Sequence, residues 1–219
     1  MDEIFKDLIK QKDFKKIAKR SILAPLNCDV VRINEEVLKM LEGDVHGYTS
    51  VDTTESGTIP PEVLNKSISS GLPPHVLRLK KDSIVILLRN LNMDQGLCNG
   101  TRLRILEMKT NVLKCEIITG TKSGNIVLLP RITLVDNTSF GYDVHRHQFP
   151  IKLSFSMTIN KSQGQTFEMI GLDLTHEVFA HGQLYVALSR VKSWDCIKVK
   201  LPEDCEERKV RNVVYEEIL

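Results

Sequence analysis

The sequence predicts an α/β fold with a largely parallel sheet, into which a small antiparallel β-barrel is inserted. Near both ends of the chain, short apolar runs alternate with helical segments, which is the pattern of parallel α/β domains. In the middle, four short β-rich runs are separated by turn-forming pairs such as Asn99-Gly100 and Ser123-Gly124. The chain has 219 residues, of which 42% are hydrophobic and 26% are charged, so it can bury a core.

The N-terminal part is predicted to place a strand between two helices. Residues 3–19 are expected to form an amphipathic helix, because apolar residues recur there at helical spacing. Residues 21–24 are a short apolar strand, and a turn leads into a helix over residues 29–41 with one apolar stripe. The polar residues 42–57 are predicted to be a long, partly exposed connection. A short helix near residues 62–67 follows two prolines.

The middle of the chain is predicted to form the antiparallel insert, with strands over residues 83–88, 101–108, 112–118 and 125–129. Their short, regular spacing favours a small barrel.

The C-terminal part is predicted to return to the parallel sheet. It begins with a strand over residues 149–159 and continues with a helix over 161–167, a strand over 169–174, a helix over 181–189 and a strand over 197–199.

Charge, cysteine content and hydropathy exclude several classes of protein. The formal net charge of +2 makes the chain mildly basic, which permits nucleic-acid binding without arguing for it. The five cysteines are widely spaced and contain no CxxC pair, so neither a zinc site nor a disulfide framework is indicated, and no metal site is predicted. The N-terminus lacks the features of a signal peptide, and no apolar run approaches the ~20 residues of a membrane helix. We therefore expect an intracellular protein without a membrane partner.

Two segments near the C-terminus carry the side chains that suit chemistry, FSMTINKSQGQTF and HGQLYVALSRV. In the first, Thr158, Asn160 and Ser162 have hydroxyl and amide groups that suit phosphate and sugar oxygens, and Gly164 lets a phosphate approach the backbone. A helix beginning near Lys161 would add backbone amides and a favourable dipole. The alternative is an ordinary strand end with a helix cap made by Asn160 or Ser162.

The second segment places Arg190 at the end of a helix, where its guanidinium can donate two hydrogen bonds to a phosphate. The alternative is a cation that only favours the helix dipole, by ~0.3 to 1 kcal/mol. A further basic cluster, His145, Arg146 and His147, is predicted either to touch a DNA backbone or to lie on a solvated loop.

These two segments resemble the last two motifs of superfamily-one helicases. The sequence between and before them narrows the resemblance to the Pif-type DNA helicases. The blocks LPPHVLRLKKDSIVILLRNLN, GLCNGTRLRIL and CEIITGTKSGNIVLLPRITL precede RHQFPIKLSFSMTINKSQGQTF in the order of that family, with the closest likeness to the Helitron-transposon branch. Upstream, RSILAPLNCDVVRIN resembles the motif that opens the family's second motor domain. The resemblance covers residues 20–202.

The resemblance implies a second RecA-like motor domain. Residues 1–76 would form its N-terminal part and residues 149–219 its C-terminal part. Residues 77–148 would be a barrel insert of the Src-homology-3 type, which the family calls 2B. It also implies a 5′-to-3′ DNA helicase and a nuclear location.

The site residues carried over from the family fall into two groups. The DNA-contacting group binds the single-stranded DNA backbone and consists of Thr158, Asn160, Lys161 and Ser162. The nucleotide-binding group consists of Gln163, Gly164 and Arg190, of which Arg190 would be the catalytic arginine finger. Many helicases have histidine where this chain has Asn160, so any role that needs a charged imidazole is in doubt.

The phosphate-binding loop GxxxxGK[ST] does not occur in this sequence. The resemblance therefore implies that ATP and Mg²⁺ are bound mainly by a first motor domain, of the same or another chain, and that this chain alone is inactive. The rival hypothesis is a noncatalytic interaction protein built on a degenerate helicase scaffold.

Overall fold

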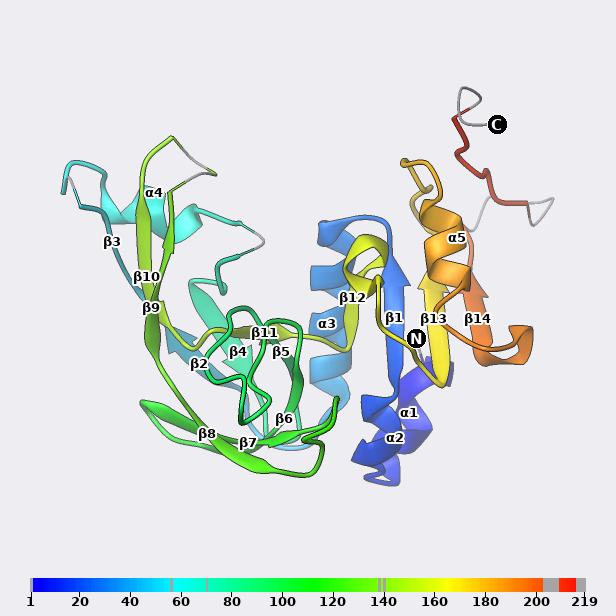
Figure 1. Ribbon diagram of the computed structural model, residues 1–219, viewed down its shortest axis with the longest axis horizontal. Helices are drawn as coiled ribbons and strands as arrows, with labels where there is room; N and C mark the ends of the chain where they lie inside the picture. The colour runs from blue at the N-terminus through cyan, green and yellow to red at the C-terminus, as the bar shows by residue number, and fades with distance from the viewer. Residues whose placement is uncertain are drawn as a thin grey trace. The chain divides into compact units, whose positions relative to one another are not determined.

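The computed structural model describes residues 2–55, 57–69, 71–137, 139, 141–202 and 209–215. The chain divides into two compact units, and each is described by itself. Unit 1 contains residues 1–40 and 154–219, and unit 2 contains residues 41–153 (Figure 1). The predicted insert, residues 77–148, lies within unit 2, which extends beyond it in both directions.

Unit 1 is built on a four-stranded sheet in the order β12-β1-β13-β14. Its strands are β1 (Arg20–Ala24), β12 (Ser156–Thr158), β13 (Met169–Asp173) and β14 (Ile197–Lys200). All three strand pairs are parallel, as the alternation of strands and helices predicted for this part of the chain. The central strands β1 and β13 are buried along almost their whole length, which explains their mostly apolar sequence, whereas the edge strand β14 is largely exposed.

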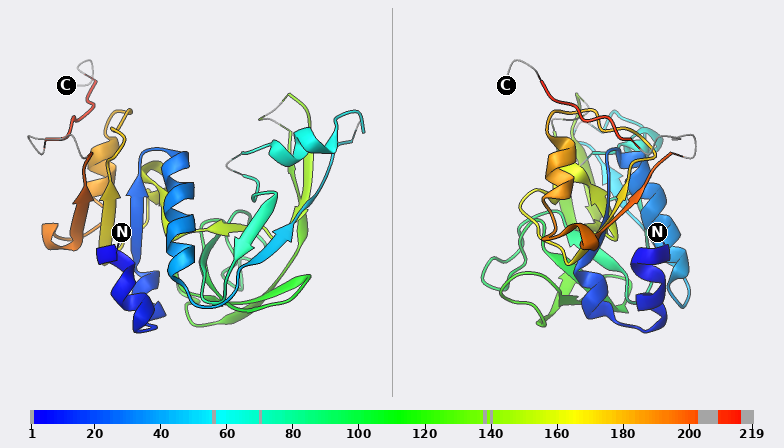
Figure 2. Two further views of the ribbon diagram at one scale, coloured as in Figure 1. Left: turned by 180° about the vertical axis from the view of Figure 1, so that it is seen from behind. Right: turned by 90° about the vertical axis from the view of Figure 1, so that its right-hand side faces the viewer.

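Two helices of unit 1 connect these strands. Helix α3 (Asn27–Met40) follows β1 and packs on β1 and β12, whereas α5 (Gln183–Leu188) lies between β13 and β14 in the sequence. The two connections run in opposite directions along the sheet. Right-handed crossovers therefore place α3 and α5 on opposite faces (Figure 2).

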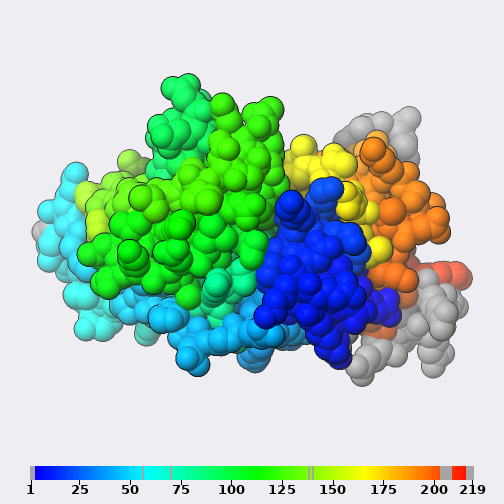
Figure 3. All heavy atoms as spheres, turned by 90° about the horizontal axis from the view of Figure 1, so that it is seen from below, coloured from blue at the N-terminus to red at the C-terminus, as the bar shows by residue number. Residues whose placement is uncertain are grey.

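The prediction of one helix over residues 3–19 is wrong. Helix α1 (Asp2–Lys10) and helix α2 (Phe14–Ala18) are separate, and both contribute to the surface of unit 1 (blue in Figure 3). Lys12 adopts a left-handed conformation with φ 54°, which ends the helical path. Asp13 then starts α2, because its carboxylate accepts a hydrogen bond from the backbone N–H of Lys16.

The predicted helix over residues 161–167 is also wrong. The chain forms a single 3₁₀ turn, η1 (Ile159–Ser162), and continues without helix towards β13. Gly164, with φ +76°, lies in this irregular stretch. A second 3₁₀ turn, η2 (Trp194–Cys196), precedes β14.

Unit 2 contains the predicted antiparallel strands. Its largest sheet has the order β11-β5-β6-β7-β8, with antiparallel pairing throughout. The strands are β5 (Ile84–Leu87), β6 (Arg102–Met108), β7 (Val112–Ile117), β8 (Ile126–Pro130) and β11 (Ile151–Leu153). The predicted strand over residues 149–159 is therefore two strands, of which β11 joins this sheet and β12 joins the parallel one. Closure of the sheet into a barrel stays a prediction.

Residues 42–57 are not the plain connection that their polar sequence predicted. They contain β2 (His46–Thr49), which pairs with β4 (Val76–Leu79), and β3 (Val51–Thr53). Strand β3 joins β10 (Val144–Gln148) and β9 (Ile132–Asp136) in a three-stranded sheet. Helix α4 (Pro61–Lys66) matches the predicted short helix.

Each unit has its own apolar core. Leu23, Ile170 and Leu172 are among the core residues of unit 1, and Leu103, Ile105 and Phe149 are among those of unit 2. Among the helices of the described residues, none is both long enough and apolar enough to span a bilayer.

Candidate nucleic-acid interface

The residues predicted to contact DNA lie where the parallel sheet ends. Thr158 is the last residue of β12 and pairs with Ala24, the last residue of β1. Ligands of open parallel sheets bind outside the carboxyl ends of the strands. The turn formed by residues 158–164 therefore starts at the carboxyl ends of the strands, where a ligand is expected.

The side chains of this 158–164 turn differ in their accessibility. Asn160, Lys161 and Gln163 are exposed, and Thr158 is half-buried. The hydroxyl of Ser162 donates to the carbonyl of Ile159 at 2.6 Å, and Ser162 is fully buried. In this structure Ser162 therefore stabilises the turn from inside and does not present its hydroxyl to solvent.

Gly164 has open space where a Cβ would stand, so the backbone at this point is accessible. Its left-handed conformation nevertheless favours glycine. The predicted helix N-terminus for anion binding is absent from this stretch, because η1 is only one 3₁₀ turn.

Arg190 joins the two sequence segments to each other. Its Nη1 lies 3.4 Å from the carbonyl oxygen of Ser162 and 3.3 Å from that of Gln165. Its Nε donates to the carbonyl of Val186 at 2.9 Å, and its own carbonyl accepts from the N–H of Phe167 at 2.9 Å. The guanidinium thus holds the chain that follows the 158–164 turn against the end of α5.

Gln183 makes a second link and is 2% exposed. Its Oε1 accepts from the N–H of Phe179 at 3.0 Å, and its Nε2 lies 3.4 Å from Oδ1 of Asn160. Sequence reasoning gave Gln183 no role. Its glutamine-to-asparagine contact depends on how α5 packs beside η1, which no local pattern predicts.

Sequence reasoning also missed a charged cluster at the carboxyl end of β13. Arg32 Nη2 lies 3.1 Å from Asp173 and 3.4 Å from Asp29, and His176 Nδ1 lies 2.8 Å from Asp29. Burial opposes ionisation of Asp173, but hydrogen bonds from Thr175 and Arg32 outweigh it and lower the pKa of this carboxyl. The spacing of Asp29 and Arg32 on one helix was the only local signal for the cluster, which joins α3 to β13.

The predicted basic cluster in β10 is not a basic surface. Arg146 is 1% exposed and forms a two-point ion pair with Asp52 on the neighbouring strand. His145 is half-buried and lies 3.2 Å from Asp143, while His147 is exposed. Strand alternation places Arg146 on the face opposite to His145 and His147, so the three side chains do not form one DNA-binding patch. Among the described residues, no group of three or more potential ligands could hold a metal ion.

Comparison with known proteins places this geometry in a family context. The family model "DNA helicase Pif1, 2B domain" matches residues 62–108. The ATP-dependent DNA helicase PIF1 of Rattus norvegicus is 32% identical over 192 residues, which cover 84% of this chain and 28% of the relative. The chain therefore spans less than a third of the length of that curated relative.

Two crystal structures are similar to this chain over most of its length. Pif1 helicase from Candida albicans has a TM-score of 0.70 and 26% identity, and the match covers 99% of this chain and 56% of the other. Pif1 from Bacteroides sp in complex with ADP-AlF4 has a TM-score of 0.57 and 26% identity, covering 91% of this chain and 45% of the other.

Proposed function

The chain belongs to the Pif1-type DNA helicases and corresponds to a C-terminal part of them, and we propose that it is the DNA-gripping and nucleotide-sensing half of an ATP-dependent motor. The observation that carries the proposal is the pair of bonds from Arg190 to Ser162 and Gln165. Through these bonds Arg190, which we propose senses the nucleotide, holds in place the 158–164 turn, which we propose binds DNA.

Single-stranded DNA would lie along the carboxyl ends of β12 and β1. Lys161 and Asn160 would contact phosphates, together with the half-buried hydroxyl of Thr158. Ser162 would act through its hydrogen bond to Ile159 and keep the turn in shape. Phosphate contacts do not read base sequence, so binding would depend little on it and strongly on salt.

ATP and Mg²⁺ would be bound mainly by a first motor domain, of the same or another chain. Gln163 and Gly164 would face the nucleotide, and Arg190 would leave the carbonyls to donate to the γ-phosphate. The Bacteroides relative in complex with ADP-AlF4 supports nucleotide binding in the family. The motif order supports further parts of the proposal: a RecA-like motor domain divided at residues 76 and 148 by a barrel insert, 5′-to-3′ movement, a nuclear location and membership of the Helitron branch.

DNA binding is tested with the purified chain and labelled oligothymidylate over a range of salt concentrations. Lys161→Ala should weaken binding and lower the slope of log affinity against log salt by about 0.7, the value for one lost contact to single strands. Lys39→Ala is the matched control, because Lys39 is exposed in the last turn of α3. This turn lies towards the amino ends of the parallel strands, away from the 158–164 turn. If both variants bind like wild type, the rival noncatalytic hypothesis is favoured.

The arginine finger is tested after the chain is joined to a matching first motor domain. Arg190→Ala should lower ATP turnover by on the order of a thousandfold, with a much smaller loss of nucleotide binding. Arg190→Lys should restore little, because lysine lacks the planar guanidinium fork. Near-normal turnover in both variants would reduce Arg190 to a structural link.

A further inference from the structure

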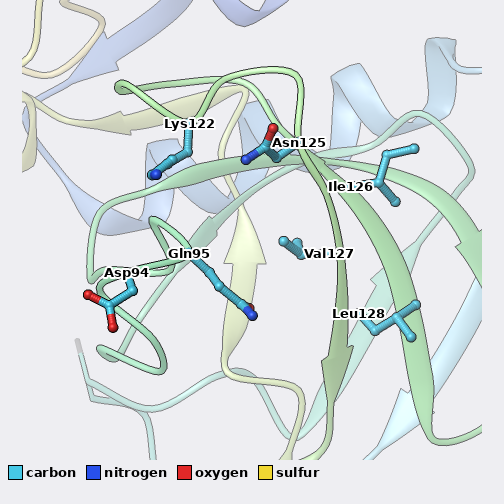
Figure 4. Close-up of a pocket in the computed structure, with 7 residues that line it drawn as sticks. All are labelled: Asp94, Gln95, Lys122, Asn125, Ile126, Val127 and Leu128. Carbon is cyan, nitrogen blue, oxygen red and sulfur yellow. The ribbon is translucent and has the colours of Figure 1, made fainter.

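Unit 2 contains a groove of about 600 Å³ beside strand β8 (Figure 4). One wall is the loop with Asp94 and Gln95, and the other is β8 from Ile126 onwards. Lys122 and Asn125, in the turn between β7 and β8, close one end. The groove involves neither the 158–164 turn nor Arg190.

The backbone of β8 is oriented to bind another strand. The N–H of Ile117 donates to the carbonyl of Asn125, which fixes the phase of the β7–β8 ladder. Because backbone groups alternate in direction along an antiparallel strand, the N–H and C=O groups of Ile126 and Leu128 point away from β7. Within the described residues, β8 is the last strand of its sheet and β7 is its one neighbour.

The side chains at this edge are apolar and accessible. Ile126 is 60% exposed and Leu128 is 65% exposed, whereas Val127 and Leu129 between them are buried. Natural proteins usually protect an exposed edge strand with charges, proline or a covering segment. Here Pro130 ends the strand, but two large apolar side chains precede it.

The charges near the groove favour one kind of occupant. Across the ladder, Lys114 is opposite Leu128 and already pairs with Glu107 at 2.9 Å. Lys122, by contrast, is exposed at the end of the groove from which β8 starts, and the one carboxylate of the lining, Asp94, belongs to the opposite wall. A carboxylate brought to that end would therefore meet a positive charge.

We propose that this groove binds an extended segment of a partner protein, which adds to β8 as an antiparallel strand. The segment would carry apolar side chains at alternate positions, to cover Ile126 and Leu128, and an acidic residue at its C-terminal end, beside Lys122. Backbone hydrogen bonds would supply affinity and the alternate side chains selectivity. A second copy of this chain fits less well, because an antiparallel pair of two β8 strands would bring Pro130 and the positively charged Arg131 of one copy, and no carboxylate, beside Lys122 of the other.

The test uses the full chain and a fluorescein-labelled peptide of alternating valine and threonine that ends in two aspartates. Fluorescence anisotropy should show saturable binding, which Leu128→Lys weakens more than tenfold. Lys122→Glu should weaken binding of this peptide but not of one that ends in two lysines. Val51→Lys is the matched control, because Val51 is 62% exposed on β3 and should leave binding unchanged. If the lysine variant does not fold, Leu128→Thr replaces it, because threonine also favours β-structure, and it should likewise weaken binding of the peptide.

Two comparisons separate strand addition from other modes of binding. A peptide methylated at the amides that face β8 should lose at least tenfold in affinity, and equal binding would overturn the proposal. Absence of saturable binding to the unmethylated peptide would overturn it as well. Concentration-dependent self-association that Leu128→Lys abolishes would assign the groove to a second copy of the chain instead. None of these results depends on DNA binding or ATP turnover, so they fail or succeed separately from the proposed function.

Discussion

Replacing Arg146 with methionine would remove the guanidinium that holds the three-stranded sheet of unit 2 to the segment around α4. Its Nε and Nη2 donate to the two carboxylate oxygens of Asp52 at 2.9 and 2.8 Å. It also donates to the carbonyls of Leu64 at 2.8 Å, Pro73 at 2.9 Å and Ser67 at 3.1 Å. All these bonds form in a fully buried site, with Arg146 1% exposed.

The expected loss follows from what Arg146→Met leaves behind. Breaking a buried ion pair by removing one partner costs about 3–5 kcal/mol, because the other charge stays buried without compensation. The carbonyls that lose a donor add ~1–3 kcal/mol each when no water replaces it. Such terms do not add fully, so we expect a loss of about 4 kcal/mol or more. Adding Asp52→Asn should recover part of it, because Asp52 without Arg146 keeps a buried charge with only Ser50 and His75 beside it.

Hydrogen exchange followed by mass spectrometry measures this loss locally. Peptides covering β3, β9 and β10 should lose protection in Arg146→Met, while those covering β1 and β13 of unit 1 serve as the internal control. A loss of less than about 1 kcal/mol in unit 2 would refute the reasoning. So would a double variant that is less stable than Arg146→Met alone.

The remaining predictions concern pH, DNA affinity, thiol reactivity and packing. Burial opposes ionisation of Asp52, but hydrogen bonds from Arg146 and Ser50 lower the pKa of its carboxyl. The stability that this ionised carboxyl contributes is present above the unfolded pKa of ~3.9 and is lost as the pH falls further. Acid unfolding of Asp52→Asn should therefore depend less steeply on pH. Arg190→Ala in the chain alone should weaken binding of oligothymidylate severalfold with an unchanged salt slope, because the residue positions the turn without touching phosphate. Burial raises the pKa of Cys115 to about 12, so a thiol reagent at neutral pH should modify the exposed Cys28 and leave Cys115 until the chain unfolds. Gly171→Ala would bring a Cβ within 3.1 Å of two isoleucine side chains and should lower the thermal midpoint, at a cost of ~1–3 kcal/mol.

The elements that sequence predicted well are those whose signal is local. The central parallel strands β1 and β13 are largely apolar runs of the expected length, and strands of the antiparallel sheet are bounded by turn-forming pairs. The failures have tertiary causes. Strand β3 contains the buried Asp52, which a hydrophobic pattern treats as loop, because its neutralising partner Arg146 is far away in the sequence. The break at Lys12 is equally invisible, since lysine is an ordinary helix former.

The candidate site was predictable by residue but not by arrangement. The motif text identified the 158–164 turn and Arg190, and the structure brings Arg190 to the carbonyls at the end of that turn. The sequence motif did not indicate that Ser162 is buried, because a serine beside polar residues is normally expected to be accessible. The roles of these residues in binding DNA and nucleotide stay predictions.

The way unit 2 interrupts unit 1 has a consequence for synthesis of the protein. Ser21 in β1 and its hydrogen-bond partner Phe155, just before β12, are 134 positions apart in the sequence. At about 5–20 residues per second, the ribosome needs roughly 7–27 s to make the chain between them. During that interval β1 has neither sheet neighbour, while residues 41–153 can already fold. A nascent chain is therefore most exposed to chaperones and aggregation through the apolar strand Arg20–Ala24, and synonymous changes that slow translation within unit 2 should lower the yield of folded protein.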